Sequence, residues 1–102
     1  SHNTFFMLRN IPHWTSKEAV VKILKDLGFS ESTYNYLCIP LSKKGNSLAG
    51  FGFLNFVKTE DAAAFPRIVK EAQVFKDKGI RMRATPMKED ALQMLRMADP
   101  NG

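Results

Sequence analysis

The sequence predicts an α+β fold, in which two helices cover one face of a four-stranded antiparallel sheet. Two segments with strand-like alternation, about Thr4–Asn10 and about Gly50–Val57, support this prediction together with two amphipathic helical patterns. Strands and helices are expected in the order βαββαβ. This order is typical of a ferredoxin-like two-layer sandwich, whose second sheet face is left free of helices.

The first predicted strand, about Thr4–Asn10, is followed by a helix with clear start and stop signals. Thr15 and Glu18 have the spacing of a capping box, so we expect the helix to begin at Thr15. Gly28 is a natural C′ residue and marks its end. Trp14 precedes the expected cap and is expected to pack as a hydrophobic staple, with base stacking as the alternative role.

The middle of the chain is expected to hold two strands joined by a polar loop. The second strand covers about Asn35–Leu41 and points Leu37 and Ile39 toward the core. The Gly-containing loop Ser42–Ser47 is flexible by composition. The third strand, about Gly50–Val57, directs alternate side chains to the core and to the opposite face.

The last part of the chain is expected to contain a helix, a strand and a further helix. Pro66 lies inside the second helical pattern and costs on the order of 3 kcal/mol there, so we expect a kink or a late start. The fourth strand covers about Ile80–Thr85, and a C-terminal helix is expected over Lys88–Ala98. We therefore expect one domain over 4–86, followed by a helix and tail over 87–102.

Length and composition favour one basic domain that works inside the cell. A chain of 102 residues has the usual size of a single domain, and its formal net charge of +5 favours an anionic partner. No apolar run is long enough to span a membrane, and a single Cys38 suits a reducing compartment, either the nucleus or the cytoplasm. The predicted strands and hairpin carry cations and no acids, namely Arg9, Lys43, Lys44, Arg81 and Arg83.

Two motifs resemble the ribonucleoprotein signatures of the RNA-recognition motif (RRM) family. The octamer Ala49–Phe56 agrees with the family pattern, except that Ala49 replaces its basic first residue. The hexamer Phe6–Ile11 keeps the Asn-Ile ending but has Met7 where the family usually carries an aromatic residue. The Mei-two-like meiosis regulators look closer, because they share this Met, the Asn-Ile-Pro that follows and a Tyr-rich second strand that runs into proline.

The resemblance implies that single-stranded RNA binds on the helix-free face of the sheet. Unpaired bases are expected to stack on Phe51 and Phe53, while Gly50 and Gly52 let backbone and bases approach closely. Apolar side chains near them and basic side chains that contact phosphates complete the expected site. The predicted RNA-binding residues are Phe51, Phe53, Met7, Arg9, Phe5, Tyr36, Arg81, Arg83, Lys43 and Lys44.

The expected protein is therefore an RNA-binding module of a larger regulatory protein that acts after transcription. It is expected to be monomeric as an isolated domain and to contact no membrane, and any protein partners are expected on its helices. No cofactor and no enzymatic activity are expected. No metal site is expected either, because His2, His13 and Cys38 lack the spacing of metal ligands.

Two alternatives remain open at this point. Met7 and Ala49 depart from the family pattern, which is compatible with a protein-binding RRM whose RNA face is masked or degenerate. The same topology also occurs in small enzymes such as acylphosphatases. An acylphosphatase needs an oxyanion-binding loop with arginine after the first strand, and the sequence Pro12-His13-Trp14 does not provide it.

Overall fold

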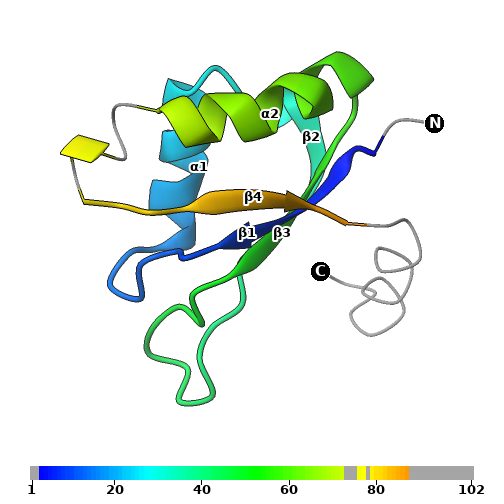
Figure 1. Ribbon diagram of the computed structural model, residues 1–102. Helices are drawn as coiled ribbons and strands as arrows, with labels where there is room; N and C mark the ends of the chain where they lie inside the picture. Colours follow the sequence, from blue (N-terminus) through cyan, green and yellow to red (C-terminus); the bar gives the residue numbers. More distant parts are fainter. Residues whose placement is uncertain (1–2, 73–75, 78, 88–102) are drawn as a thin grey trace.

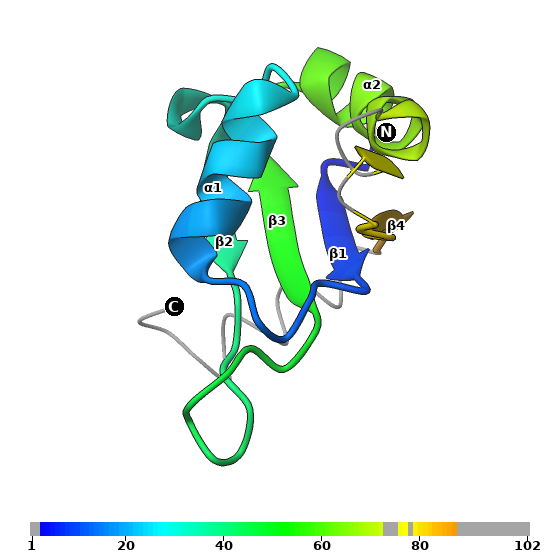
Figure 2. The same ribbon diagram turned by 90° about the vertical axis from the view of Figure 1, so that its left-hand side faces the viewer.

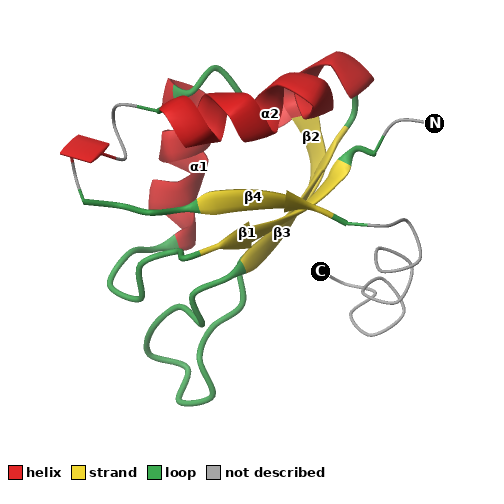
Figure 3. Cartoon of the chain, in the orientation of Figure 1, coloured by secondary structure: helices red, strands yellow, loops and turns green. Residues whose placement is uncertain are grey.

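The computed structural model describes residues 3–72, 76–77 and 79–87, and these residues form the expected two-layer sandwich (Figures 1 and 3). The strands form one antiparallel sheet in the order β2-β3-β1-β4. Both α-helices lie on the same side of this sheet, as Figure 2 shows. The C-terminal helix expected over 88–98 lies outside the described residues. The elements are β1 (Phe5–Arg9), α1 (Lys17–Asp26), the 3₁₀ helix η1 (Glu31–Thr33), β2 (Tyr34–Cys38), β3 (Gly52–Phe56), α2 (Thr59–Glu71) and β4 (Arg83–Pro86).

The main hydrophobic core fills the space between the helices and the sheet. Phe6 from β1, Phe56 from β3 and Phe65 from α2 pack edge to face within it, and the Phe56 and Phe65 ring centroids lie 4.9 Å apart. Burying an aromatic side chain is worth about 1.5–3 kcal/mol, so these rings contribute strongly to holding the layers together. Leu8 and Leu54 point to the same core, which confirms the predicted alternation in β1 and β3.

The N-terminus of α1 differs by one residue from the expected cap. Ser16 is the N-cap, and its hydroxyl accepts a hydrogen bond of 3.1 Å from the Ala19 amide. The Thr15 amide donates instead to the Pro12 carbonyl, which closes a turn before the helix. The expected capping box at Thr15 is therefore wrong, because this turn moves the helix start by one position. Trp14 consequently lies too far from the cap for a staple and remains exposed.

The C-terminus of α1 confirms the role predicted for Gly28. Leu27 is the C-cap, and Gly28 follows with φ of +101°, a value that residues with a Cβ rarely adopt. The Phe29 amide donates to the Leu24 carbonyl at 2.8 Å, and the Gly28 amide donates to the Lys25 carbonyl at 3.0 Å. These two bonds form a Schellman motif, and Phe29 is thereby directed into the core.

Helix α2 runs continuously through Pro66, so the expected late start is wrong. The predicted apolar face is present, because Ala62, Phe65 and Val69 are all buried against the sheet. Phe65 and Val69 lie before and after the proline on this face. Their burial offsets the roughly 3 kcal/mol that an internal proline costs, and the helix therefore continues.

Strand β4 begins at Arg83, later than the sequence suggested, and extends to Pro86. Met82 precedes the strand but is buried in the main core, as its inward position in the pattern predicted. Because β4 is an edge strand, Pro86 is tolerated there without the loss of an internal ladder bond.

A β-bulge in β2 places its two tyrosines on opposite faces of the sheet. Tyr34 pairs with Phe56 and Tyr36 pairs with Asn55, so the register shifts between the two tyrosines. Tyr34 packs against the main core, whereas Tyr36 packs on the helix-free face next to Phe5. Only Tyr36 therefore belongs to the helix-free face.

The Tyr34 hydroxyl is buried and has no hydrogen-bond partner among the described residues. Desolvation by burial raises the pKa of Tyr34, and the negative charge of Glu31 raises it further. A buried donor without a partner loses its hydration and gains nothing in return, which costs about 1–3 kcal/mol.

Tyr34→Phe is expected to stabilise the domain by about 1 kcal/mol at neutral pH, because it removes this unpaired hydroxyl. Because the pKa of Tyr34 is raised in the folded state, the parent domain has its full stability below the ordinary pKa of tyrosine. It loses stability as the pH rises through the folded-state pKa. Urea unfolding from pH 7 to 11 should therefore show the advantage of the variant growing on the alkaline side. A variant less stable than the parent across this range would contradict the assignment.

Candidate nucleic-acid interface

A second apolar cluster lies on the face of the sheet away from the helices. Phe5 is at its centre, with its ring centroid 6.1 Å from that of Phe53 and 6.3 Å from that of Tyr36. The Phe51 ring meets Phe53 edge to face at 5.7 Å. We call this group the sheet-face cluster; it consists of Phe5, Phe53, Met7, Tyr36, Phe51 and Met87.

The strand register explains why these residues meet. Cys38, Phe53, Met7 and Thr85 lie side by side across the four strands, because each is paired with the next. Residues paired across strands share a face of the sheet. All the apolar residues predicted for the site are therefore brought together, and Met87, which is not among the predicted RNA-binding residues, joins them.

The rings are less exposed than isolated stacking residues would be. Only 2% of Phe5 and 9% of Phe53 is exposed, because the rings pack against one another and against neighbouring side chains. A backbone hydrogen bond fixes Met87 beside Phe5, because the Met87 amide donates to the Phe5 carbonyl at 2.8 Å. Phe53, which is predicted as a stacking ring, is therefore largely covered in the free domain. Phe51 and Tyr36 are half-buried and present more accessible surface.

Asn55 is a residue of this face whose role the sequence reasoning missed. It is 7% exposed, and its side-chain oxygen accepts a hydrogen bond of 2.8 Å from the Thr4 hydroxyl. Its side-chain nitrogen donates to the Asn35 side-chain oxygen, also at 2.8 Å. This chain of bonds links β3 to β2 and to the residue before β1. The signal available in the sequence was a single amide within an otherwise apolar octamer.

The predicted arginines gather at one end of the sheet. Arg9 lies opposite Arg83 in the register between β1 and β4, and both are exposed. Asn10, which has φ of +60°, donates from its side chain to the Arg81 carbonyl at 3.3 Å and so ties the end of β1 to the chain before β4. Like charges placed opposite each other repel, so this end of the sheet favours an anion.

Lys43 and Lys44 lie at a different place, in the β2–β3 loop that extends beyond the sheet (Figures 1 and 3). The loop contains more order than its composition suggested. Leu41 and Leu48 form an isolated bridge, and the Ser42 amide donates to the Ser47 carbonyl at 2.7 Å. Both lysines are exposed.

The two octamer glycines serve the packing of the protein itself. A Cβ added to Gly52 would lie 2.6 Å from the Ile39 Cδ1 atom and 2.9 Å from the Cys38 carbonyl oxygen. Gly50 has φ of +101°, and a Cβ there would lie 3.2 Å from the His13 ring. The expectation that these glycines let bases approach is therefore wrong for Gly52, which faces the core.

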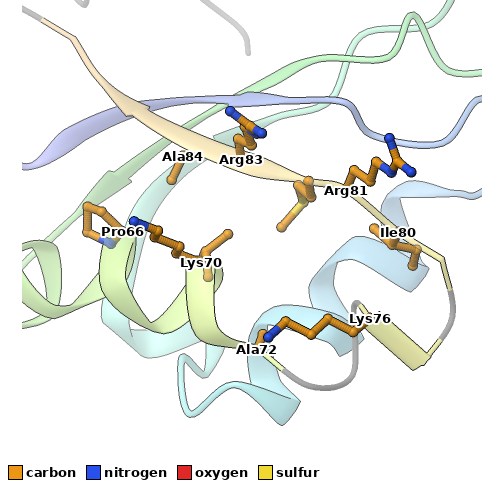
Figure 4. A pocket seen from close by; sticks show the side chains of 10 residues that line it. Pro66, Lys70, Ala72, Lys76, Ile80, Arg81, Arg83 and Ala84 are labelled. Carbon is orange, nitrogen blue, oxygen red and sulfur yellow. The ribbon is translucent and has the colours of Figure 1, made fainter.

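A cavity of about 630 Å³ lies at the edge of the sheet between α2 and β4 (Figure 4). Val69, Ile80 and Met82 supply apolar lining, and the described lining contains no acid, histidine or cysteine. Figure 4 shows Arg81 and Arg83 pointing away from this cavity, so their charges belong to the other side of β4.

The described residues provide neither a metal site nor a membrane-spanning helix. They contain no group of three or more histidine, cysteine or acidic side chains able to hold a metal ion. In the same part of the chain, no helix combines the length and the apolar character that crossing a membrane requires.

Comparison with known proteins identifies the fold. The RNA15 RRM superposes with a TM-score of 0.69 at 14% identity, covering 91% of this chain and 99% of that one. The RNA15 RRM with bound RNA (GU) gives 0.68 at 13% identity, covering 94% and 98%. The penultimate RNA recognition motif of the hypothetical RNA-binding protein RBM19 gives 0.62 at 20% identity, covering 87% of each chain. The chain has the RRM fold. No family model and no curated protein matches the sequence.

Within this RRM fold, Arg83→Thr is expected to stabilise the RNA-free domain by about 0.2–1 kcal/mol, because it removes the like charge opposite Arg9. The midpoint of urea unfolding at low salt measures the effect. Arg81→Thr is the matched control, since Arg81 lies before β4 and outside the paired register. Equal shifts for the two variants would show that the cross-strand repulsion is not the cause.

Proposed function

We propose that this domain binds single-stranded RNA on the sheet-face cluster. The observation that carries the proposal is the gathering of aromatic rings on the helix-free face, beside an end of the sheet that carries arginines. Stacking on aromatic side chains combined with cationic contacts is how proteins bind unpaired nucleic acid. The RRM fold supports the proposal, and structures of two proteins with this fold are described as containing RNA.

In this proposal, the residues of the sheet face have different roles in RNA binding. Phe51 and Tyr36 are half-buried and offer ring surface to bases, while Phe53 supports Phe51 from the side. Met7 contacts a base by dispersion and does not stack as an aromatic ring does. Arg9 and Arg83 pair with a phosphate, which relieves the repulsion between them.

The finer assignments belong to this proposal as well. The hexamer with Met7 and the Asn-Ile-Pro that follows support kinship with the Mei-two-like regulators, and therefore a role in regulation after transcription, inside the nucleus or cytoplasm. We place the RNA-binding domain over 4–86 and a separate C-terminal segment over 87–102. The domain is proposed to act as a monomer without a catalytic step, and Lys43 and Lys44 are proposed to contact RNA from the β2–β3 loop.

A protein-binding function is the second candidate, and the burial of Phe5 and Phe53 favours it. A face whose rings are already packed has less surface to offer to bases. The cavity between α2 and β4 would then provide a separate surface for a partner. The two candidates differ in their response to salt, because only RNA binding releases counterions from a phosphate backbone.

Phe51→Ala is expected to weaken RNA binding by about 1–3 kcal/mol, the usual worth of one base–aromatic stack. Phe53→Ala is expected to weaken binding and also to destabilise the fold by about 3 kcal/mol, because the Phe53 ring is buried. Fluorescence anisotropy with a randomised RNA pool and urea unfolding separate the two effects. Val57→Ala, on an exposed residue after β3, is the control. RNA affinity unchanged in Phe51→Ala would contradict stacking at this face.

RNA binding is expected to fall with added salt, but only moderately. Ala49 removes the usual basic residue of the octamer, so the domain should neutralise about 2–4 phosphates. The expected slope of log K against log salt is about −0.7 per phosphate. Titrations at salt concentrations from about 50 to about 300 mM, over which the Debye length shortens roughly twofold, measure this slope. A slope near zero would favour the protein-binding candidate.

A further inference from the structure

Trp14 is the most exposed of the large hydrophobic residues that the structure describes. It is 77% exposed, although burying an aromatic side chain is worth about 1.5–3 kcal/mol. The staple that would have given it a structural role is absent, because Ser16 and not Thr15 caps α1. Tryptophan combines a large apolar surface with little conformational entropy and is enriched at binding sites. Within the described residues, no packing role accounts for this exposure, which makes Trp14 a candidate for contact with a ligand.

The backbone holds Trp14 in a defined position. The Thr15 amide donates to the Pro12 carbonyl at 3.2 Å, so Trp14 lies within a closed turn. The residue before it is tied to the β2–β3 loop twice: the His13 Nδ1 atom is hydrogen-bonded to the Leu48 carbonyl oxygen at 2.8 Å, and the Leu48 amide donates to the His13 carbonyl at 3.4 Å. Trp14 thus lies on a loop that is hydrogen-bonded to the β2–β3 loop.

The surroundings of Trp14 favour an anionic ligand. The segments 1–17 and 33–59, which meet at the His13–Leu48 contact, contain no aspartate or glutamate, and Glu18 in the first turn of α1 is the first acid after segment 1–17. The second segment carries Lys43 and Lys44 in the β2–β3 loop. An aromatic ring on one loop and cations on the loop hydrogen-bonded to it suit an unpaired base followed by its phosphate.

The position of this turn connects it with the sheet face. Arg9 ends β1, and the chain then leads through Pro12 to Trp14. Figures 1 and 2 show the loop after β1 and the loop between β2 and β3 at the same end of the sheet. The arginines of the sheet face lie at this end too, so an RNA strand that continued from the sheet-face cluster past Arg9 would run toward the turn that carries Trp14.

We propose that Trp14 is a second stacking site, which binds a base of the RNA strand that continues beyond the sheet-face cluster. This inference rests on the proposed RNA binding and extends it to a second, loop-borne surface. It predicts a dependence on length, because an RNA long enough to reach Trp14 gains a stack that a shorter RNA cannot make.

Trp14 is the single tryptophan of the chain, so its own fluorescence reports the contact. A randomised pool of about 12-nucleotide RNA is expected to quench the emission at saturation, whereas a trinucleotide pool is not. Trp14→Ala is expected to weaken binding of the long RNA by about 5- to 100-fold, the equivalent of one base–aromatic stack, as measured by anisotropy of labelled RNA. The same variant should bind the trinucleotide like the parent. Trp14→Phe should retain most of the affinity for the long RNA.

The controls separate this inference from the proposed function. Val57→Ala removes an exposed apolar side chain after the opposite end of β3 and should leave both affinities unchanged. If Phe51→Ala weakens binding but Trp14→Ala does not, the second stacking site is wrong and sheet-face binding stands. If the parent binds neither RNA, the proposed function itself fails. Emission that changes with an acidic apolar peptide and not with RNA would assign Trp14 to a protein partner and overturn the inference.

Discussion

The antiparallel pairing of β1 with β3 is the constraint on which the rest of the structure depends. These two strands are the centre of the sheet, and their register sets Phe6 opposite Leu54 and Met7 opposite Phe53. One pair feeds the core under the helices, and the other belongs to the sheet-face cluster. A shift by one residue would exchange the faces and bury Arg9 among the core residues, so the register is strongly specified.

The two faces of the sheet differ in their packing and in their charge. The covered face is a tightly packed aromatic and aliphatic core, in which Phe6, Phe56 and Phe65 interlock. The other face keeps apolar rings in partial contact with solvent and places Arg9 opposite Arg83. The repulsion between Arg9 and Arg83 lowers the stability of the free domain, and a bound anion, as in the proposed RNA complex, would relieve it.

The burial of Phe53 refines the usual picture of rings that stand free on a sheet. Phe53 packs against Phe5 and meets Phe51 edge to face, so in the proposed RNA complex it would hold the Phe51 ring in place for stacking. A side chain that is already held in place loses less conformational entropy when a ligand binds. The hydrogen bonds between His13 and Leu48 likewise fix the loop after β1 against the β2–β3 loop.

The sequence by itself determined the fold class, the inward and outward sets of β1 and β3, and the apolar face of α2. These features follow from periodicity, which depends only on local backbone geometry. Only the tertiary structure decided that Ser16 caps α1, that a bulge sends Tyr34 and Tyr36 to opposite faces, and that Phe53 is buried. The Ser16 cap depends on a short-range turn that periodicity does not reveal, whereas the bulge and the burial of Phe53 depend on contacts between residues far apart in the chain. A local pattern shows which way a side chain points, whereas its solvent exposure depends on what the rest of the chain places beside it.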